Sequence, residues 1–353
     1  MTVSRPSRTT WAARVEALLQ RHWWQTQPSL LMRLLWPLSI IYGTLARRAR
    51  LQASPQGGPA VPVLVVGNLV VGGAGKTPAV IALVQAFQAA GRSPGVISRG
   101  HGRQGDSVRA VTAIDGAQQV GDEPLLIQRR TGVPVWVGRD RSAAARALCA
   151  AHPEVDVLLS DDGLQHSRLR RDAELLVFDD RGAGNGLLLP GGPLREPLPA
   201  RAARHQRVLY TGQHVSTALP GALGQRQLGQ AWPLADWLRG DGRTAVDLQA
   251  LRGRPLLAVA GLAAPQKFFD MLAAAGLTFD TLPLPDHHAY ATLPWSADIA
   301  EVLTTEKDAV KLDPSALQAT RVWVLPLDFR LPPGLAADLL TLLPALPHTT
   351  PPP

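Results

Sequence analysis

The sequence GNLVVGGAGKTP at residues 67–78 decides the fold of this chain. An apolar, β-branched run at residues 63–66 precedes it and predicts a buried strand, and residues 79–90 predict a helix with one apolar face. This order is typical of a phosphate-binding loop, because glycines let backbone N–H groups converge on phosphate oxygens at a helix N-terminus. The plainer alternative, a glycine-rich turn with a surface lysine, does not explain why all three features coincide.

The loop also predicts which side chains meet the phosphates. We expect Lys76 to reach the β- and γ-phosphates of a nucleotide and the Thr77 hydroxyl to bind Mg²⁺. The other residues that we expect to bind the phosphates, through their backbone N–H groups, are Gly72, Gly73, Ala74 and Gly75. The strict pattern places a glycine where this chain has Val70, so we interpret the loop as a variant of that pattern.

Charge is unevenly distributed along the 353 residues. The net charge is +8, and residues 1–53 contain eight arginines and one glutamate, a net charge of +7. The remaining chain is therefore close to neutral, which argues against a body that binds nucleic acid. The single cysteine, Cys149, excludes an internal disulfide and a multi-cysteine metal site and fits a reducing compartment.

Residues 1–53 are expected to form a basic, amphipathic arm of one or two helices that lies in a membrane interface. The uncharged stretch between Arg33 and Arg47 is shorter than the roughly 20 residues of a spanning helix, and Pro37 interrupts it. Two alternatives remain at this point. The first is a cleavable signal peptide that ends near residues 44–46, although its cleavage would export a nucleotide-binding loop to a place without ATP. The second is a helix that packs on the body of the protein.

The rest of the chain predicts an α/β protein. Strands and helices alternate after the loop, which indicates a P-loop NTPase-type parallel sheet with helices on both faces and ligands at the carboxyl ends of its strands. We expect a kinase-like core at residues 54–212 and a connector at 213–250 that could include a β-ribbon. A second, smaller α/β lobe is expected at 251–345, and a Pro-rich disordered tail at 346–353.

Two aspartates, Asp161 and Asp162, end an apolar strand at residues 155–160. A carboxylate in this place can hold Mg²⁺ opposite Thr77, and the alternative is a turn made of aspartates. Gln165 and His166 follow and could orient a water molecule or a substrate group.

Other polar residues have open roles in the sequence alone. Asp122 is either a helix cap or a base that accepts a hydroxyl proton, and His287 or His288 could pair with it, cap a loop or bind a metal. Lys307 is either a salt-bridged turn residue or part of the site. Arginines that could recognise substrate phosphate, or else be solvated, are Arg99, Arg103, Arg139, Arg141 and Arg195.

Taken together, the motifs resemble those of the tetraacyldisaccharide 4′-kinases of lipid A synthesis. The matching stretches run from about residue 30 to 312 in the order of that family: PLSIIYG, VGNLVVGGAGKTP, VISRGHGR, VGDEPLLI, SDDGLQHSRLRRDAELLVFD, GNGLLLPGGPLRE, AGLAAPQKFF, LPDHHAY and TTEKDAVKL. His101 is a departure, since the family usually has tyrosine there, and AGLAAP is a looser match than the others.

The resemblance implies an activity and a location. ATP would donate its γ-phosphoryl group to the 4′-hydroxyl of a tetraacyl glucosamine disaccharide 1-phosphate, with Mg²⁺ as cofactor. The substrate is a lipid, so the arm would hold the protein at the cytoplasmic face of the bacterial inner membrane. The sequence indicates no nucleic-acid partner and no obligate protein partner.

The resemblance also implies roles for individual residues. Asp122 would be the base with His287 supporting it, Lys76 and Thr77 would contact phosphate and Mg²⁺, and Asp161 and Asp162 would lie on the metal side. Substrate or supporting positions would be Gln165, Arg141, Arg195, Glu196 and Arg99. The rival function is a membrane-tethered regulatory ATPase or GTPase switch, which would release phosphate into solution instead of transferring it to a lipid.

Overall fold

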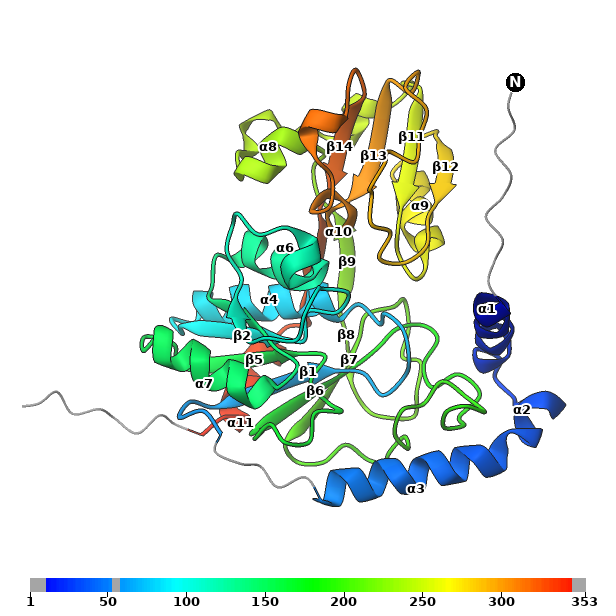
Figure 1. The fold of residues 1–353 in the computed structure, drawn as a ribbon, viewed down its shortest axis with the longest axis vertical. Helices are drawn as coiled ribbons and strands as arrows, with labels where there is room; N and C mark the ends of the chain where they lie inside the picture. Colours follow the sequence, from blue (N-terminus) through cyan, green and yellow to red (C-terminus); the bar gives the residue numbers. More distant parts are fainter. Residues whose placement is uncertain (1–10, 53–57, 345–353) are drawn as a thin grey trace, which may run out of the picture.

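The computed structural model describes residues 11–52 and 58–344. They form a helical arm, a core lobe that carries the glycine-rich loop, and a second lobe at the opposite end from the arm's longest helix (Figure 1). The predicted tail at 346–353 lies outside the described residues, as do residues 1–10 of the predicted arm.

The core lobe is built on an eight-stranded sheet in the order β3-β4-β2-β5-β1-β6-β7-β8. Its strands are β1 (Val63–Gly67), β2 (Pro94–Ser98), β3 (Arg109–Ala110), β4 (Val135–Val137), β5 (Val157–Asp161), β6 (Ala173–Phe178), β7 (Gln206–Tyr210) and β8 (Ala222–Leu223). Every neighbouring pair is parallel except β3 and β4, which are antiparallel. The predicted parallel α/β sheet is confirmed.

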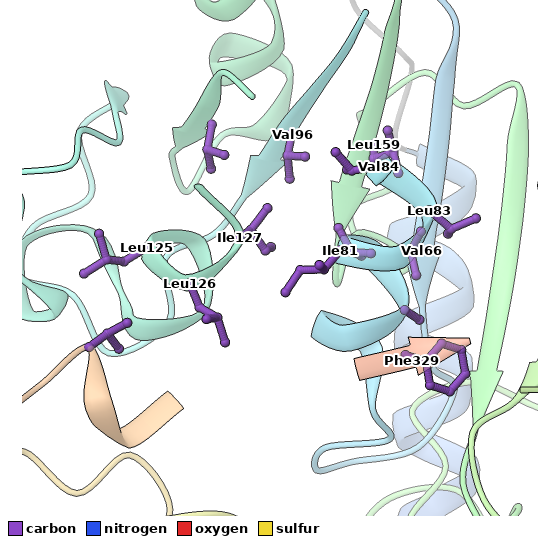
Figure 2. Packing of buried hydrophobic residues seen from close by; sticks show 14 of the residues in the cluster. Val66, Ile81, Leu83, Val84, Val96, Leu125, Leu126, Ile127, Leu159 and Phe329 are labelled. Atoms are coloured by element: carbon purple, nitrogen blue, oxygen red, sulfur yellow. The ribbon is translucent and has the colours of Figure 1, made fainter. Parts of the chain in front are cut away.

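Helices cover both faces of this sheet. They are α4 (Lys76–Ala89), α5 (Ala117–Val120), α6 (Asp122–Thr131), α7 (Arg141–Ala151) and α11 (Leu335–Leu342). One buried cluster joins side chains of α4 and α6 to those of β1, β2 and β5, as Figure 2 shows for Val84, Ile127 and Leu159. A second cluster, on the other face, contains Ala144 and Leu148 of α7. The two cores fix the carboxyl ends of the strands relative to α4 and α6, where the polar residues gather.

The second lobe has its own five-stranded sheet in the order β10-β14-β13-β11-β12. Its strands are β10 (Trp232–Pro233), β11 (Leu256–Ala260), β12 (Asp280–Pro283), β13 (Glu301–Thr305) and β14 (Arg321–Leu325). Its helices are α8 (Leu234–Arg239), α9 (Pro265–Ala274) and α10 (Glu306–Ala309), with short 3₁₀ turns η1 (Gly242–Thr244), η2 (Leu248–Leu251) and η3 (Pro314–Ala316). All pairs are parallel except β10 with β14.

The two lobes are joined by a two-stranded ribbon. Strand β9 (Gln225–Leu228) pairs antiparallel with β15 (Leu327–Arg330), so the chain enters the second lobe along one strand and returns along the other. The structure differs here from the predicted boundaries at 213–250 and 251–345. Strand β10 belongs to the sheet of the second lobe, and α11 packs on α4 of the core lobe, because each buries its apolar side chains there.

The described arm has three helices rather than one or two: α1 (Trp11–Trp23), α2 (Leu30–Leu34) and α3 (Trp36–Gln52). Pro37 does not interrupt α3, because it lies in the first turn, where a missing backbone N–H breaks no helical hydrogen bond. None of the helices in the described ranges combines the length and the apolar character that crossing a bilayer requires.

Candidate active site

The glycine-rich loop connects the end of β1 to the start of α4. Gly72 has φ +83° and Gly75 has φ +79°, left-handed values that glycine adopts easily. A Cβ atom at Gly75 would also collide with the Arg226 guanidinium and lie 2.9 Å from Thr211 Oγ1. The path of the loop therefore requires glycine at this position, and it leaves backbone N–H groups at the N-terminus of α4, where an anion is stabilised.

Val70 departs from the strict loop pattern for a structural reason. It is fully buried and forms an antiparallel bridge with Leu194. Beside this bridge, the backbone N–H of Arg195 donates to Leu69 O at 2.7 Å. An extended residue that is packed in this way favours a β-branched side chain, so the position does not need glycine.

The Lys76 side chain is buried and is held at the loop by two acceptors. Its Nζ donates to Asn68 Oδ1 at 3.1 Å and lies 3.4 Å from Asp162 Oδ1. Asn68 in turn donates to Gly72 O at 3.1 Å. Asn68 is a site residue that our sequence reasoning missed. Its signal was a polar side chain directly after a buried strand, the same signal that pointed to Asp161.

Asp161 is a buried carboxylate without a partner. Neither of its side-chain oxygens has a hydrogen bond to any described residue. Burial raises the pKa of Asp161 to about 7, and the nearby charges of Glu123 and Asp162 act in the same direction. The charges of Lys76 and Arg141 oppose this rise without cancelling it, and no described residue donates a hydrogen bond that would stabilise the ionised form.

Asp162 is surrounded by cations instead. It adopts φ +50°, just after the end of β5, and its Oδ2 lies 3.7 Å from Arg195 Nη1. Burial alone raises the pKa of Asp162. The charges of Lys76, Arg195 and Arg141 together lower it by more, so the net pKa lies below its ordinary value.

The residues at the end of β5 fit a Mg²⁺ ion. Within residues 11–52 and 58–344, no group of three or more His, Cys, Asp or Glu is placed to hold a metal on its own. Mg²⁺ at a nucleotide site usually takes one or two protein ligands and completes its shell with phosphate oxygens and water. The unpaired oxygens of Asp161 fit such an ion because it would supply the partner they lack, and Thr77 at the start of α4 is the matching hydroxyl.

Asp122 and His287 meet across the two lobes. His287 Nδ1 lies 2.9 Å from Asp122 Oδ2, while Asp122 Oδ1 accepts the backbone N–H of Glu123 at 2.9 Å. His287 follows β12 and has φ +57°, and its N–H donates to Asp286 Oδ1 at 3.0 Å. The ring of His101 lies beside it, with centroids 5.1 Å apart. Asp122 therefore bonds the start of its own helix with one oxygen and the imidazole with the other.

The surroundings keep this pair charged. Burial on its own raises the pKa of Asp122. Together the hydrogen bond from His287 and the charges of Lys307 and Lys311 lower it by more, so the net pKa lies below the ordinary value. The same hydrogen bond raises the pKa of His287. The contact thus favours an ionised Asp122 and a protonated His287, and an ionised carboxylate can accept a proton.

A pocket of about 190 Å³ lies between the glycine-rich loop and the second lobe. Its lining combines loop residues with apolar side chains of the second lobe, among them Gly73, Lys76, Thr77, Leu262, Phe268 and Met271. Lys307 also lines it, with Nζ 3.2 Å from Glu123 Oε1 and 3.3 Å from Asp286 Oδ1. Lys307 therefore pairs with carboxylates of both lobes at the edge of the phosphate loop.

A wider cleft of about 850 Å³ includes Asp162 in its lining. Its cationic lining consists of Arg99, Arg139, Arg141, Arg168 and Arg195. Arg141 Nη2 donates to Asp162 O at 3.0 Å, and Arg195 Nη1 donates to Gln165 Oε1 at 3.2 Å. Asp106, Glu123, Asp140 and Asp162 also line the cleft, so its guanidinium groups suit a phosphate by direct bidentate bonds rather than by a net positive field.

The predicted site residues are mostly neighbours in space. Glu196 joins the arginine cleft, because its Oε1 accepts from Gln165 Nε2 at 3.3 Å. His288 does not join it, since its ring packs edge-on against Tyr290 at 4.8 Å. Arg103 donates to the backbone carbonyl of Ser107 at 2.6 Å instead of joining the bonds around Asp162.

Comparisons with known proteins agree with this geometry. The sequence profile described as tetraacyldisaccharide-1-P 4′-kinase matches residues 31–344. The chain is 52% identical to the tetraacyldisaccharide 4′-kinase of Leptothrix cholodnii, covering 95% of this chain and 98% of that protein. It is 49% identical to the enzyme of the same name from Methylibium petroleiphilum, covering 96% of each chain.

A solved structure is similar as well. The crystal structure of LpxK from Aquifex aeolicus in complex with ATP superposes with a TM-score of 0.70 at 25% identity, covering 89% of this chain and all of that one. The resemblance inferred from the motifs is confirmed by the sequence profile and by the relatives. The chain belongs to the tetraacyldisaccharide 4′-kinase family.

Proposed function

We propose that this enzyme transfers the γ-phosphoryl group of ATP to the 4′-hydroxyl of a tetraacyl glucosamine disaccharide 1-phosphate. The observation that carries the proposal is the Asp122–His287 pair, 2.9 Å apart and contributed by different lobes beside a glycine-rich loop. A nucleotide switch has no need of a charged carboxylate–imidazolium pair at this place. An enzyme that must deprotonate an acceptor hydroxyl does need one.

In the proposed reaction the 4′-oxygen attacks the γ-phosphorus, and the bond between that phosphorus and the β,γ-bridging oxygen breaks. ADP keeps the bridging oxygen and its electron pair, and Asp122 accepts the proton of the hydroxyl. His287 keeps Asp122 ionised until the proton arrives, because its hydrogen bond lowers the pKa of that carboxyl. Lys76 and the N–H groups of the loop neutralise charge on the phosphates.

Mg²⁺, held by Thr77 and the carboxylates that end β5, would neutralise phosphate charge during transfer. Around it, Arg141 and Arg195 keep Asp162 ionised, and Asn68 keeps Lys76 directed at the loop. These residues position and neutralise charged groups, which is where most catalysis of phosphoryl transfer originates.

The decisive experiment follows label from [γ-³²P]ATP to purified disaccharide 1-phosphate in detergent micelles. The wild type should label the lipid, and Asp122→Asn should reduce turnover about 10²–10⁴-fold, the range expected for loss of a general base. Asp270→Asn, which removes an exposed carboxylate of α9, should leave turnover unchanged. Label that appears only as free phosphate would favour the regulatory switch, and near-normal turnover of Asp122→Asn would remove it as the base.

We further propose that the arm binds the cytoplasmic face of the inner membrane. Helices α2 and α3 expose a set of large apolar side chains: Leu30, Leu34, Trp36, Leu38, Ile40, Ile41 and Leu45. Arg33, Arg47 and Arg48 are also exposed on these helices. Apolar side chains flanked by arginines suit insertion into the headgroup region of an anionic bilayer.

Removing residues 1–52 should abolish most co-sedimentation with vesicles that contain anionic phospholipid. Leu38→Glu/Ile41→Glu in the full chain should weaken it as well, because each change places a carboxylate on the apolar face. The double variant Leu38→Met/Ile41→Met keeps that face apolar and is the matched control. Full co-sedimentation of the truncated protein would refute the membrane role of the arm.

A further inference from the structure

Helix α3 has an inner face that is bonded to one loop of the core lobe, residues 187–196. Ser39 Oγ donates to Leu188 O at 2.8 Å and accepts the backbone N–H of Gly191 at 3.0 Å. One turn later, a Cβ atom at Gly43 would lie 2.6 Å from Leu188 Cδ1, so the helix and the loop are in close contact. The inner face thus presents small and polar residues, while the apolar side chains of α3 point elsewhere.

The same loop is bonded to the phosphate loop on its other side. Val71 N–H donates to Pro193 O at 2.9 Å, and Arg195 N–H donates to Leu69 O at 2.7 Å. The Val70–Leu194 bridge lies between these two hydrogen bonds. Residues 193–195 therefore act as a short strand that links the arm to the first half of the glycine-rich loop.

Tyr42 completes the link at Arg195. Its hydroxyl donates to the Arg195 carbonyl at 3.2 Å, in a half-buried position. The backbone of Arg195 is thereby held from both sides, by Leu69 through its N–H and by Tyr42 through its carbonyl. Its side chain extends from this fixed backbone toward Asp162 and Gln165 in the wider cleft.

We propose that Tyr42 is a positioning residue that places the Arg195 guanidinium for phosphoryl transfer. The Arg195 guanidinium stabilises the negative charge of Asp162 and lines the wider cleft. A loosened Arg195 backbone would therefore weaken both its contact with Asp162 and its contact with an acceptor. Because Tyr42 belongs to the arm, the seating of α3 on the core lobe sets the geometry of the site. This inference rests on the proposed kinase function.

The test compares Tyr42→Phe with Thr44→Val in the full-length protein, using the lipid phosphorylation assay. Tyr42→Phe removes only the hydroxyl and should lower kcat about 3–10-fold, the equivalent of one hydrogen bond in the transition state, with the KM for ATP unchanged. Thr44 is exposed on the same helix and bonds only its own turn, at Ile40 O, so Thr44→Val should keep wild-type kcat. Both variants should keep wild-type binding to anionic vesicles and a wild-type Tm.

A double-mutant cycle separates positioning from a general structural effect. In an Arg195→Ala background, adding Tyr42→Phe should change kcat by less than about 1.5-fold, because the group that Tyr42 positions is gone. Wild-type kcat in Tyr42→Phe would overturn the inference, and so would an undiminished effect in the Arg195→Ala background. Failure of the wild type to label the lipid would refute the kinase proposal itself and is recognised before any variant is measured.

Discussion

A carboxylate that serves as a base has to stay ionised although burial favours its neutral form. Asp122 meets this requirement through His287 and two lysines, Lys307 and Lys311, all of which come from the second lobe. Asp161, at the end of β5, has no hydrogen-bond partner among the described residues, and burial raises its pKa to about 7 although Lys76 and Arg141 oppose the rise. The two buried aspartates therefore suit different roles: Asp122 can accept a proton, and Asp161 can bind a cation.

His287→Gln tests how Asp122 stays ionised. Without the hydrogen bond and the charge of His287, the effect of burial on Asp122 is opposed less strongly, so its pKa should rise. We expect the acid limb of the kcat/KM profile to move to higher pH, because a base must be deprotonated to act.

His152→Gln is the matched control, since His152 is a surface residue that pairs with the exposed Glu154. Its pH profile should overlay that of the wild type. An acid limb in His287→Gln that stays in place would mean that His287 does not set the ionisation of Asp122.

At the level of elements, the loop tolerates Val70 because the chain there is a strand rather than a turn. Restoring the strict pattern with Val70→Gly should therefore lower the stability of the protein, because it removes a fully buried side chain and makes an extended backbone more flexible. We expect a loss of about 2–4 kcal/mol in the free energy of unfolding, measured by urea titration.

Gly73→Ala is the contrasting change in the same loop. A Cβ there meets no atom within 4 Å, and the backbone is not left-handed, so stability should stay within about 0.5 kcal/mol of the wild type. Equal stability of Val70→Gly and the wild type would show that the buried Val70 side chain contributes nothing to stability.

The elements of the core lobe could be predicted because each is an apolar run between polar turns, as at residues 63–66 and 155–160. The ends of these elements are harder to predict: α4 begins at Lys76 instead of residue 79, because Pro78 is tolerated in the first turn of a helix. Strand β9, with the sequence QRQL, lacks the alternation of apolar and polar residues that predicts a strand. Its partner β15 lies about 100 residues later in the chain. A local pattern cannot reveal such a pairing.

The same limit applies to the site. Lys76 and Asp161 were predictable because each has a fixed place in a strand–loop–helix unit. The contact of Lys307 with Glu123 spans 184 residues, and that of Tyr42 with Arg195 spans 153, so neither leaves a local trace in the sequence. For the same reason, the local sequence around Asp122 does not distinguish a helix cap from a base; the resemblance to the kinase family implies its pairing with His287, and the structure places the two 2.9 Å apart.

For the molecule as a whole, an ion-pair cluster joins α6 of the core lobe to the second lobe and the ribbon. Arg130 at the end of α6 donates to Glu306 Oε2 at 2.7 Å and to Asp328 Oδ1 at 2.6 Å. Glu306 is almost fully buried and also accepts from Trp237 Nε1 at 3.1 Å. Burial raises the pKa of Glu306, and Arg130 is the main influence that opposes this.

Arg130→Met should destabilise the protein by about 3–5 kcal/mol, because it leaves Glu306 buried without its counter-ion. Asp328→Asn, at a half-exposed partner, should cost less than about 1 kcal/mol. Both are measured as shifts of the urea unfolding transition. In Arg130→Met the folded pKa of Glu306 should lie further above its unfolded value, so the deficit should grow as pH rises and shrink as pH falls. A deficit that does not depend on pH would refute this account of Glu306.

The ribbon of β9 and β15 has a consequence for when bound ATP can react. A strip of two hydrogen-bonded strands bends across its face more readily than it shears within its plane, so it favours one axis of rotation for the second lobe. Rotation about this axis would separate His287, Lys307 and Lys311 from the core lobe together, while the glycine-rich loop stayed intact. An opened enzyme would then hold ATP while Asp122 has lost the side chains that orient it, so the transfer would wait until the lobes close over an acceptor.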